Sequence, residues 1–314
     1  MTNKGSSDKI NYLIRPAKQV ERKLIIEALQ CLGKSYDVAN YTYVGMGSRY
    51  FVDFQMVHKS LGISDMISFE KEEDKIRRFD FNRPYSFIDL KPGLSTEILP
   101  ILDWSKDFVI WLDYDSKISP YMADDIKIIC DNAKAGTILI LTIDAEPKRF
   151  DDKIPENEIE RMDFRIKNLK KFIHPYYPQE LKRPDMAKMN FPKVLHKIVK
   201  EIVRDCLRFN AVDFFQVFNF IYEDTSQMYT YGCVFDDDGE RLKETRLYDL
   251  KHISGDDNFI KIKLPILTPR EKMLFDRLLP GIVEKLEEFE MAPEKLHTYE
   301  EYSRYYPQYF EVYI

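Results

Sequence analysis

Apolar residues recur at every third or fourth position in one stretch near the start of the chain. In residues 15–32, Val20, Leu24, Ala28 and Leu32 fall on one side of a helical wheel, which predicts a helix over Arg15–Leu32. The polar residues of this stretch are expected mainly on the opposite, solvent-facing side, and they include Lys18, Glu21, Arg22 and Lys23.

Further along, the pattern changes to short runs that are rich in β-branched and aromatic residues. The runs are Tyr41–Val44, Met66–Phe69, Ser86–Leu90, Phe108–Leu112 and Thr137–Ile143. Stretches long enough for a helix separate them, which is typical of parallel strands joined by right-handed crossovers. The sequence therefore predicts an α/β fold with a doubly wound, mainly parallel sheet.

Two later runs predict a different kind of pairing. Phe214–Tyr222 and Tyr229–Phe235 are separated by a short polar connection, as in an antiparallel hairpin at one edge of the sheet. A further helix is expected over Thr268–Phe289, and the aromatic segment Tyr299–Ile314 is expected to dock on the core.

These patterns divide the chain into five parts. We expect a helical segment (1–40), a ligand-binding core (41–147), a basic helical insertion that serves as a lid or acceptor site (148–212), the edge hairpin (213–236), and a helical extension with the aromatic arm (237–314).

Composition narrows the class of protein. With 314 residues, 44% apolar and 32% charged, the chain has the composition of a globular domain, and its apolar runs are too short to span a bilayer. Residues 1–9 lack the apolar core of a secretory signal, so a cytoplasmic location is expected. The four cysteines lie far apart and are interpreted as reduced thiols. Oligomeric state is left open.

The net charge and its distribution along the chain indicate which classes of partner the protein can bind. A net charge of −6 argues against a protein that binds nucleic acid along its whole length, although a local basic face remains an alternative. Residues 148–208 carry 16 Lys and Arg against 10 Asp and Glu, an excess of +6. An anionic small-molecule acceptor at this insertion would match that charge, but a solvated helix face is the common explanation of such a stretch.

Ligands of open parallel sheets bind beyond the carboxyl ends of the strands. There the first strand runs into Val44-Gly45-Met46-Gly47-Ser48, whose glycines allow backbone to approach a ligand closely. The second strand ends at Glu70, 25 residues beyond Gly45, where nucleoside sites often hold an acid for the ribose hydroxyls. The alternative is that Glu70 is an acid in the first turn of the following helix, where it interacts favourably with the helix dipole.

These residues carry a resemblance to class I S-adenosylmethionine-dependent methyltransferases, whose fold is Rossmann-like. The chain also resembles the catechol-type O-methyltransferases in its middle, and bacterial O-methyltransferase-like proteins over nearly its whole length. The likeness to the bacterial O-methyltransferase-like proteins is carried by Ile14-Arg15-Pro16-Ala17-Lys18, Glu21-Arg22-Lys23, Tyr43-Val44-Gly45-Met46-Gly47-Ser48 and Phe81-Asn82-Arg83-Pro84.

The resemblance implies S-adenosyl-L-methionine as cofactor and methyl transfer to an oxygen. The cofactor-binding residues that it implies or that its motifs contain are Gly45, Met46, Gly47, Ser48, Glu70, Ser95 and Asp113. Ser95 would lie beside the adenine. Asp113 and Asp144 would hold magnesium, and Lys117, offset by one residue from the family's position, would be the base, with Asp113 as its catalytic neighbour.

Departures from the family pattern keep two other functions open. Ala145 stands where the catechol-type enzymes have a third metal ligand, and Arg49 replaces the usual third glycine. A methyltransferase-like binding or sensor module, in a bacterial defence or nucleic-acid-processing system, is therefore one alternative. A metal-dependent nuclease that uses Asp113, Asp115 and Asp144 is the other.

Overall fold

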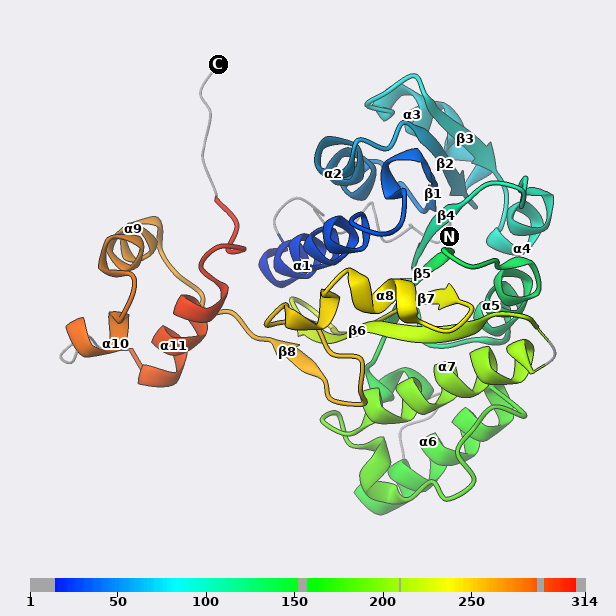
Figure 1. Ribbon diagram of the computed structural model, residues 1–314. Coiled ribbons are helices and arrows are strands. Elements are labelled where there is room, and N and C mark those ends of the chain that lie inside the picture. Colours follow the sequence, from blue (N-terminus) through cyan, green and yellow to red (C-terminus); the bar gives the residue numbers. More distant parts are fainter. Residues whose placement is uncertain (1–14, 152–156, 209, 287–290, 309–314) are drawn as a thin grey trace.

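The computed structural model describes residues 15–151, 157–208, 210–286 and 291–308. Eight strands form one sheet in the order β3-β2-β1-β4-β5-β7-β6-β8 (Figure 1). The strands are β1 (Thr42–Gly45), β2 (Asp65–Glu70), β3 (Ile88–Pro92), β4 (Phe108–Asp113), β5 (Ile138–Asp144), β6 (Asp213–Glu223), β7 (Gln227–Asp236) and β8 (Ile260–Ile262). Strands β1–β5 are mutually parallel, and β7 runs antiparallel to β5 and β6. The expected Rossmann-like sheet with an antiparallel edge hairpin is confirmed.

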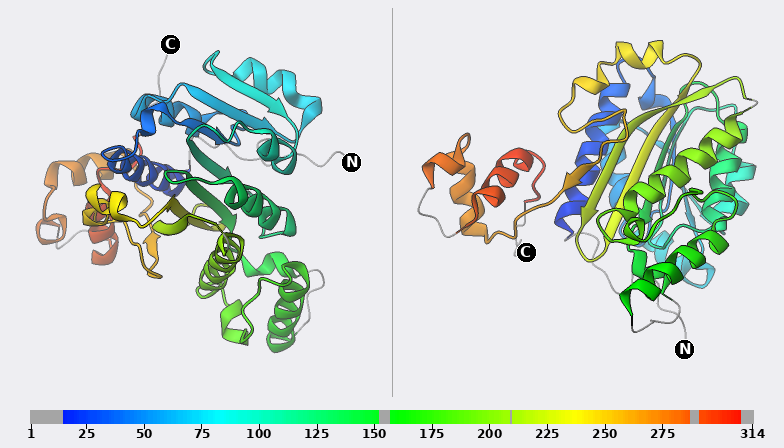
Figure 2. Two further views of the ribbon diagram at one scale, coloured as in Figure 1. Left: turned by 45° about the vertical axis from the view of Figure 1, so that its right-hand side comes forward. Right: turned by 90° about the horizontal axis from the view of Figure 1, so that it is seen from below.

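Helices cover both faces of the sheet (Figure 2). Helices α1 (Pro16–Leu32) and α2 (Val52–Leu61) pack on one face, whereas α5 (Pro120–Asn132) and α7 (Phe191–Leu207) pack on the other. Side chains of β4 alternate accordingly, with Trp111 toward the first layer and Ile110 toward the second. Burial on both faces explains why the central strands are continuous apolar runs without polar alternation.

The sheet has a switch point between β1 and β4. From β1 the chain builds outward through β2 and β3, and it then returns to the other side of β1 to add β4 and β5. The short helix α3 (Ile76–Asn82) lies in the β2–β3 connection, and α4 (Ser95–Ile98) lies in the connection that returns from β3 to β4. The connections diverge at this point, which leaves space at the carboxyl ends of the strands.

The basic insertion divides into two parts in the structure. Helix α6 (Glu158–Phe172) stands at the periphery, but α7 packs against α5 and buries ten of its residues in the core. The second half of the expected lid is thus a crossover helix of the sheet. Its strong amphipathicity reflects this packing.

The C-terminal extension forms a smaller helical unit beyond α1 (Figures 1 and 2). The unit contains α9 (Pro269–Leu278), α10 (Ile282–Lys285) and α11 (Pro293–Tyr302), which share a small core of their own. Helix α8 (Glu240–Glu244) packs on the main core instead, and β8 belongs to the sheet. Thr268 caps α9 as expected, but the helix predicted to reach Phe289 ends at Leu278. Pro280 has no N–H to donate and Gly281 adopts φ +81°, so the helix cannot continue through them. Phe289 lies outside the described residues.

The aromatic segment docks as predicted over its described part. Tyr299, Tyr302, Tyr305 and Tyr306 are buried, and the Tyr305 hydroxyl donates to Glu27 of α1. Residues 309–314 lie outside the described residues, as do residues 1–14 at the other end of the chain.

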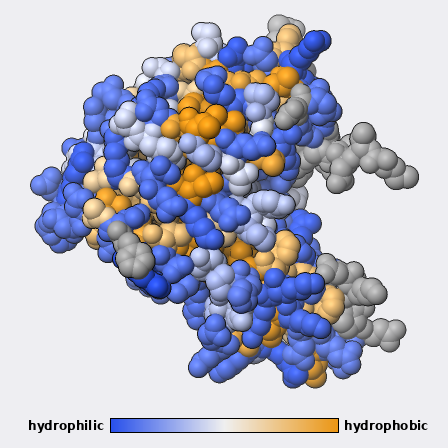
Figure 3. Space-filling model, turned by 90° about the vertical axis from the view of Figure 1, so that its right-hand side faces the viewer, coloured by the Kyte–Doolittle hydropathy of each residue, from blue (hydrophilic) through white to orange (hydrophobic). Residues whose placement is uncertain are grey.

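The face shown in Figure 3 is mostly hydrophilic, with several separate apolar patches. Within the described ranges, no helix has both the length and the apolar composition that crossing a bilayer requires.

Candidate functional site

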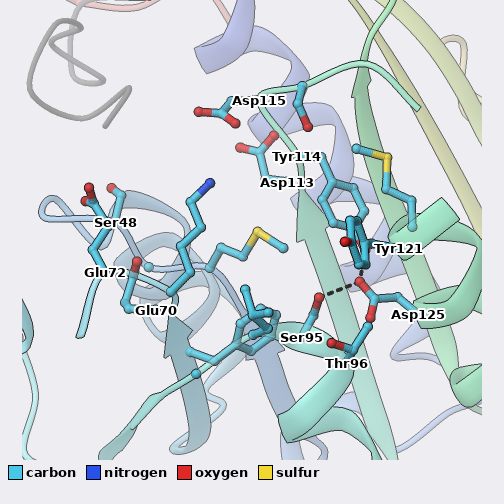
Figure 4. A pocket seen from close by; sticks show the side chains of 18 of the residues that line it. Ser48, Glu70, Glu72, Ser95, Thr96, Asp113, Tyr114, Asp115, Tyr121 and Asp125 are labelled. Carbon is cyan, nitrogen blue, oxygen red and sulfur yellow. Dashed lines mark hydrogen bonds between the residues drawn. The ribbon is translucent and has the colours of Figure 1, made fainter. Parts of the chain in front are cut away.

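A cavity of about 490 Å³ opens at the carboxyl ends of β1, β2 and β4, beside the switch point of the sheet. Most of its walls come from the turn after β1, the end of β2, the start of α4, and the connection from β4 into α5 (Figure 4), and residues of α1, α2 and α3 complete them. The sequence-predicted residues that line it are Met46, Gly47, Ser48, Glu70, Ser95 and Asp113. The structure thus brings six of the nine predicted site residues together.

The turn after β1 is shaped by close packing. A Cβ on Gly47 would lie 2.5 Å from the Phe51 ring and 2.7 Å from Ser68 Oγ, so no side chain fits there. The Gly47 N–H donates to the same Ser68 Oγ at 3.1 Å. Ser48 adopts φ 50°, which turns its backbone N–H toward the end of β2. Gly45, by contrast, is buried and does not line the cavity.

Glu70 ends β2 and its carboxyl group lies at the cavity wall. One oxygen accepts the backbone N–H of Ser48, whereas Oε1 is buried without a hydrogen-bond partner. Burial raises the pKa of Glu70 to about 7, and the Ser48 N–H lowers it only in part. A buried carboxylate oxygen without a donor is costly, so this atom is a candidate for a ligand hydroxyl.

Ser95 begins α4, and a carboxylate from α5 holds its hydroxyl. Asp125 Oδ2 accepts hydrogen bonds from Ser95 Oγ and from the Tyr114 hydroxyl, each at 2.5 Å. All three residues line the cavity, and Asp125 is fully buried. Sequence reasoning missed Asp125 and Tyr114, because neither belongs to a recognised motif and only the fold brings α5 beside α4.

Helix α1 contributes a second group of charges that the sequence pattern had assigned to solvent. Lys18, Glu21 and Arg22 are buried. Lys18 Nζ lies 3.0 Å from Asp113 Oδ2 and 3.1 Å from Glu21 Oε2. Burial raises the pKa of Glu21, and the charge of Lys18 lowers it in part.

Arg22 extends this group to the cavity wall. Its Nε donates to Asp53 Oδ1 of α2 at 2.5 Å, and both residues line the cavity. The signal that could have revealed the group was the charged cluster inside the Arg15–Lys18 and Glu21–Lys23 motifs, which lies on an otherwise apolar helix.

Two predicted site residues lie away from the cavity. Asp144 is 1% exposed, and its oxygens accept from the Glu146 N–H at 2.9 Å and from Arg149 Nε at 2.7 Å. Lys117 Nζ donates to the Arg149 carbonyl at 2.9 Å and stacks 4.8 Å from the ring centres of Phe150 and Phe172. Neither side chain reaches the cavity, so this geometry contradicts the expected role of Lys117 as the base.

The predicted magnesium site does not fit these surroundings. Asp113 is paired with Lys18 and Asp144 with Arg149, so each carboxylate already has a cation from the chain itself. Among the described residues, no three His, Cys, Asp or Glu side chains gather as metal ligands. The arrangement of Asp113, Asp115 and Asp144 that a nuclease would need is also absent, because Asp113 and Asp115 line the cavity and Asp144 does not.

The charge of the cavity also differs from the expectation for an anionic acceptor. Six acids line it against two basic residues, Arg22 and Lys71. The acids are Asp53, Glu70, Glu72, Asp113, Asp115 and Asp125. No described residue of the basic insertion takes part. The electrostatic field of these walls favours a neutral or cationic guest over an anion.

Comparison with known families gives a match over nearly the whole chain. A family model described as "Putative O-methyltransferase" matches residues 10–314. A comparison with curated proteins gave no match. The family description is that of an enzyme, so the comparisons lend no support to the alternative of a binding or sensor module.

Solved structures with a similar arrangement include three methyltransferases or cofactor complexes. Trm1 from Pyrococcus horikoshii with S-adenosyl-L-methionine has 8% identity and a TM-score of 0.45, with 72% of this chain and 57% of that chain covered. The B. subtilis M1A22 tRNA methyltransferase TrmK has 12% identity and a TM-score of 0.35, with 88% and 93% covered. Human N-acetylserotonin methyltransferase with SAM has 10% identity and a TM-score of 0.34, with 65% and 50% covered. The chain spans about half the length of the first and third of these.

Proposed function

The chain belongs to the family described as "Putative O-methyltransferase", and from this premise we propose that its cavity binds S-adenosyl-L-methionine and transfers the methyl group to an oxygen of a small-molecule acceptor. The observation that carries the proposal is Glu70, whose buried Oε1 has no partner at the wall of a cavity beside the switch point. Ribose hydroxyls supply the donors that this carboxylate lacks.

The residues around Glu70 fit an adenosyl group. Gly47 and Ser48 bring backbone to the cavity with little side-chain volume. Leu94, Tyr121 and Met122 add apolar and aromatic walls, which suit a flat base. When bound, S-adenosyl-L-methionine supplies an electrophilic methyl group on a positively charged sulfur.

Asp113 is the residue that handles the acceptor proton. Its carboxylate is 19% exposed at the cavity wall, and Lys18 holds it from behind at 3.0 Å. When an acceptor hydroxyl is methylated, its proton would pass to the Asp113 carboxylate. Alignment and exclusion of water complete the requirements of the transfer.

The acceptor is a neutral or cationic molecule with a hydroxyl group. Asp53, Asp113 and Asp115 all line the cavity, and Arg22, one of its two basic residues, is already paired with Asp53. A phosphorylated acceptor would meet repulsion from these carboxylates. The proposal therefore replaces the anionic acceptor that the basic insertion had indicated.

Isothermal titration calorimetry with S-adenosyl-L-methionine and S-adenosyl-L-homocysteine tests cofactor binding directly. We expect saturable binding of both, and an affinity for S-adenosyl-L-homocysteine that falls about 10- to 100-fold in Glu70→Ala, since two ribose hydroxyls lose their acceptor. The matched control is Glu244→Ala, an exposed acid of α8 far from the cavity. Folded wild-type protein that binds neither compound would reject the proposal.

Transfer itself is tested with methyl-labelled cofactor and a panel of hydroxyl compounds in three groups: neutral, cationic and phosphorylated. Mass spectrometry of the products identifies the methylated atom. We expect label on an oxygen of a neutral or cationic compound, and loss of turnover in Asp113→Asn. Label on nitrogen, or on phosphorylated compounds alone, would contradict the proposed acceptor.

A further inference from the structure

Two of the four cysteines lie far apart in the sequence but are neighbours in the folded chain. Cys130 lies near the end of α5, and Cys206 lies near the end of α7. These two helices pack side by side on the same face of the sheet (Figure 1). The Cys130 thiol donates a hydrogen bond to the sulfur of Cys206. The tertiary structure therefore forms a pair of thiols that the spacing of the cysteines did not indicate.

The chain around this thiol pair ties the two helix ends together. Asn210, which follows α7, donates from Nδ2 to the Cys130 carbonyl at 2.8 Å. The Tyr176 hydroxyl donates to Asp205 of α7 at 3.0 Å, and Lys127 of α5 lies 5.3 Å from the centre of the Tyr176 ring. A disulfide forms without movement of the backbone only where two sulfurs are already neighbours. These contacts hold the sulfurs in that relation.

The two thiols differ in exposure and in charge. Cys130 is fully buried, whereas Cys206 is partly exposed. The hydrogen bond from Cys130 lowers the pKa of the Cys206 thiol, and burial offsets this only in part. Lys127 lowers the same pKa, whereas Asp131 and Asp205 raise it. The hydrogen bond and burial both raise the pKa of Cys130. Cys206 is therefore the thiol that ionises first and that an oxidant in solution reaches.

The other two cysteines lack this combination of exposure and a thiol partner. Cys31 is buried on the opposite face of the sheet, where its S–H donates to the Thr245 carbonyl at 3.2 Å. Cys233 is fully buried within β7. The structure describes all four cysteines, and Cys206 is the one that is both partly exposed and hydrogen-bonded to a second thiol.

We propose that Cys206 and Cys130 form a reversible disulfide when the protein meets hydrogen peroxide. The Cys206 thiolate attacks one peroxide oxygen, the O–O bond breaks, and hydroxide leaves as Cys206 becomes a sulfenic acid. The Cys130 sulfur then attacks the Cys206 sulfur, the S–O bond breaks, and a second hydroxide leaves. The two sulfurs together lose two electrons, which the peroxide gains, and each thiol proton leaves in one of the two waters.

The disulfide would lie away from the cavity. The residues of α5 that line the cavity are Tyr121, Met122 and Asp125, in the first half of the helix, and Cys130 is in its last turn. Formation of the disulfide is therefore independent of what the cavity binds. It would join α5 to α7, the two helices that cover one face of the sheet.

Peptide mapping of the folded wild-type chain tests the disulfide directly. The protein is treated with hydrogen peroxide, the remaining thiols are blocked with N-ethylmaleimide in urea, and a non-reducing digest is analysed by mass spectrometry. We expect a linked peptide pair that joins Cys130 to Cys206 and that dithiothreitol separates, while Cys31 and Cys233 carry the blocking group. Four blocked thiols, a bond from Cys130 to Cys233, or a bond between two chains would overturn the proposal. This measurement decides the proposal even if a variant fails to fold.

Two variants then test the assigned order of reaction. In Cys130→Ser the second thiol is absent, so the Cys206 sulfenic acid should persist and react with dimedone, whereas the wild type should show little of this label. In Cys206→Ser the buried Cys130 should remain a free thiol. Cys31→Ser is the matched control and should form the wild-type disulfide. Equal dimedone labelling of the wild type and Cys130→Ser would show that Cys130 does not react with the sulfenic acid, which contradicts the proposal.

Discussion

Two acids end parallel strands at the same edge of the sheet, yet their surroundings are opposite. Glu70, at the end of β2, keeps a buried oxygen without a partner at the cavity wall. Asp144, at the end of β5, has both oxygens bonded within the chain, one to the Glu146 N–H and one to Arg149. Position at a strand end therefore does not by itself mark a ligand-binding acid. An acid is available to a ligand only where other groups of the chain do not already donate hydrogen bonds to its oxygens.

Asp113 lies between these extremes, because it lines the cavity and is also paired. Its partner Lys18 is fully buried, so the pair is part of the structure as well as of the site. Breaking such a pair on one side leaves a charge buried without compensation.

The largest effect is expected from Lys18→Met, which leaves Glu21 and Asp113 without their shared cation. The free energy of unfolding should fall by about 3–5 kcal/mol, measured by urea denaturation at neutral pH. Lys59→Met, at an exposed position of α2, should change it by less than about 0.5 kcal/mol. Equal stabilities of the two variants would show that the buried pair is not what holds Asp113.

The glycines beside Glu70 should differ from each other in the same assay. Gly47→Ala is expected to cost about 1–3 kcal/mol, because the new methyl group would overlap Phe51 and Ser68. Gly45→Ala should cost less, since the nearest atom to its Cβ would be the Tyr43 hydroxyl at 3.0 Å. A reversed order would mean that the turn relaxes easily and that packing is not why glycine stands at position 47.

The unpaired acid should make ligand binding depend on pH. Burial raises the pKa of Glu70 to about 7, and ribose hydroxyls donate to its ionised form. The affinity for S-adenosyl-L-homocysteine should therefore be constant above about pH 8 and weaken below pH 7, approaching tenfold per pH unit. Calorimetry between pH 5.5 and 8.5 measures this slope. In Glu70→Gln the slope should flatten, and a wild-type profile without slope would contradict the assignment.

The smallest effect is expected from metal ions. Because Asp113 and Asp144 already pair with Lys18 and Arg149, millimolar magnesium should leave the melting temperature and the affinity for S-adenosyl-L-homocysteine unchanged. Addition of EDTA should also leave both unchanged. A rise in melting temperature with magnesium, lost in Asp144→Asn, would revive the metal site that the catechol-type resemblance implied.

Sequence reasoning located the strands well and the ends of helices less well. Each predicted strand is present within two residues of its expected bounds, because a strand buried on both faces is an unbroken apolar run. The helix from Thr268 was expected to pass through Leu279-Pro280-Gly281, and these residues end it at Leu278. Strand β8 was missed, since three residues carry no periodicity.

The residues of the candidate site also fall into those that the sequence could predict and those that it could not. Gly47, Glu70 and Ser95 could be predicted because each follows a strand along the chain, and parallel strands end at a common edge. Lys18 and Asp125 could not, because they come from helices whose contacts with that edge depend on packing. The roles of Lys117 and Asp144 were implied by the resemblance, but the Arg149 carbonyl holds Lys117 and the Arg149 side chain holds Asp144, both away from the cavity.

The amino-acid sequence alone determined the order of strands and helices along the chain and the edge of the sheet where a ligand is expected, because periodicity and strand ends are local properties of a chain. Only the tertiary structure decided which charged groups at that edge are satisfied. A hydrogen bond between Asp125 and Ser95 joins residues 30 positions apart, and the pair of Lys18 and Asp113 joins two different layers of the molecule. Such pairings depend on distances that exist only after the helices have packed on the sheet.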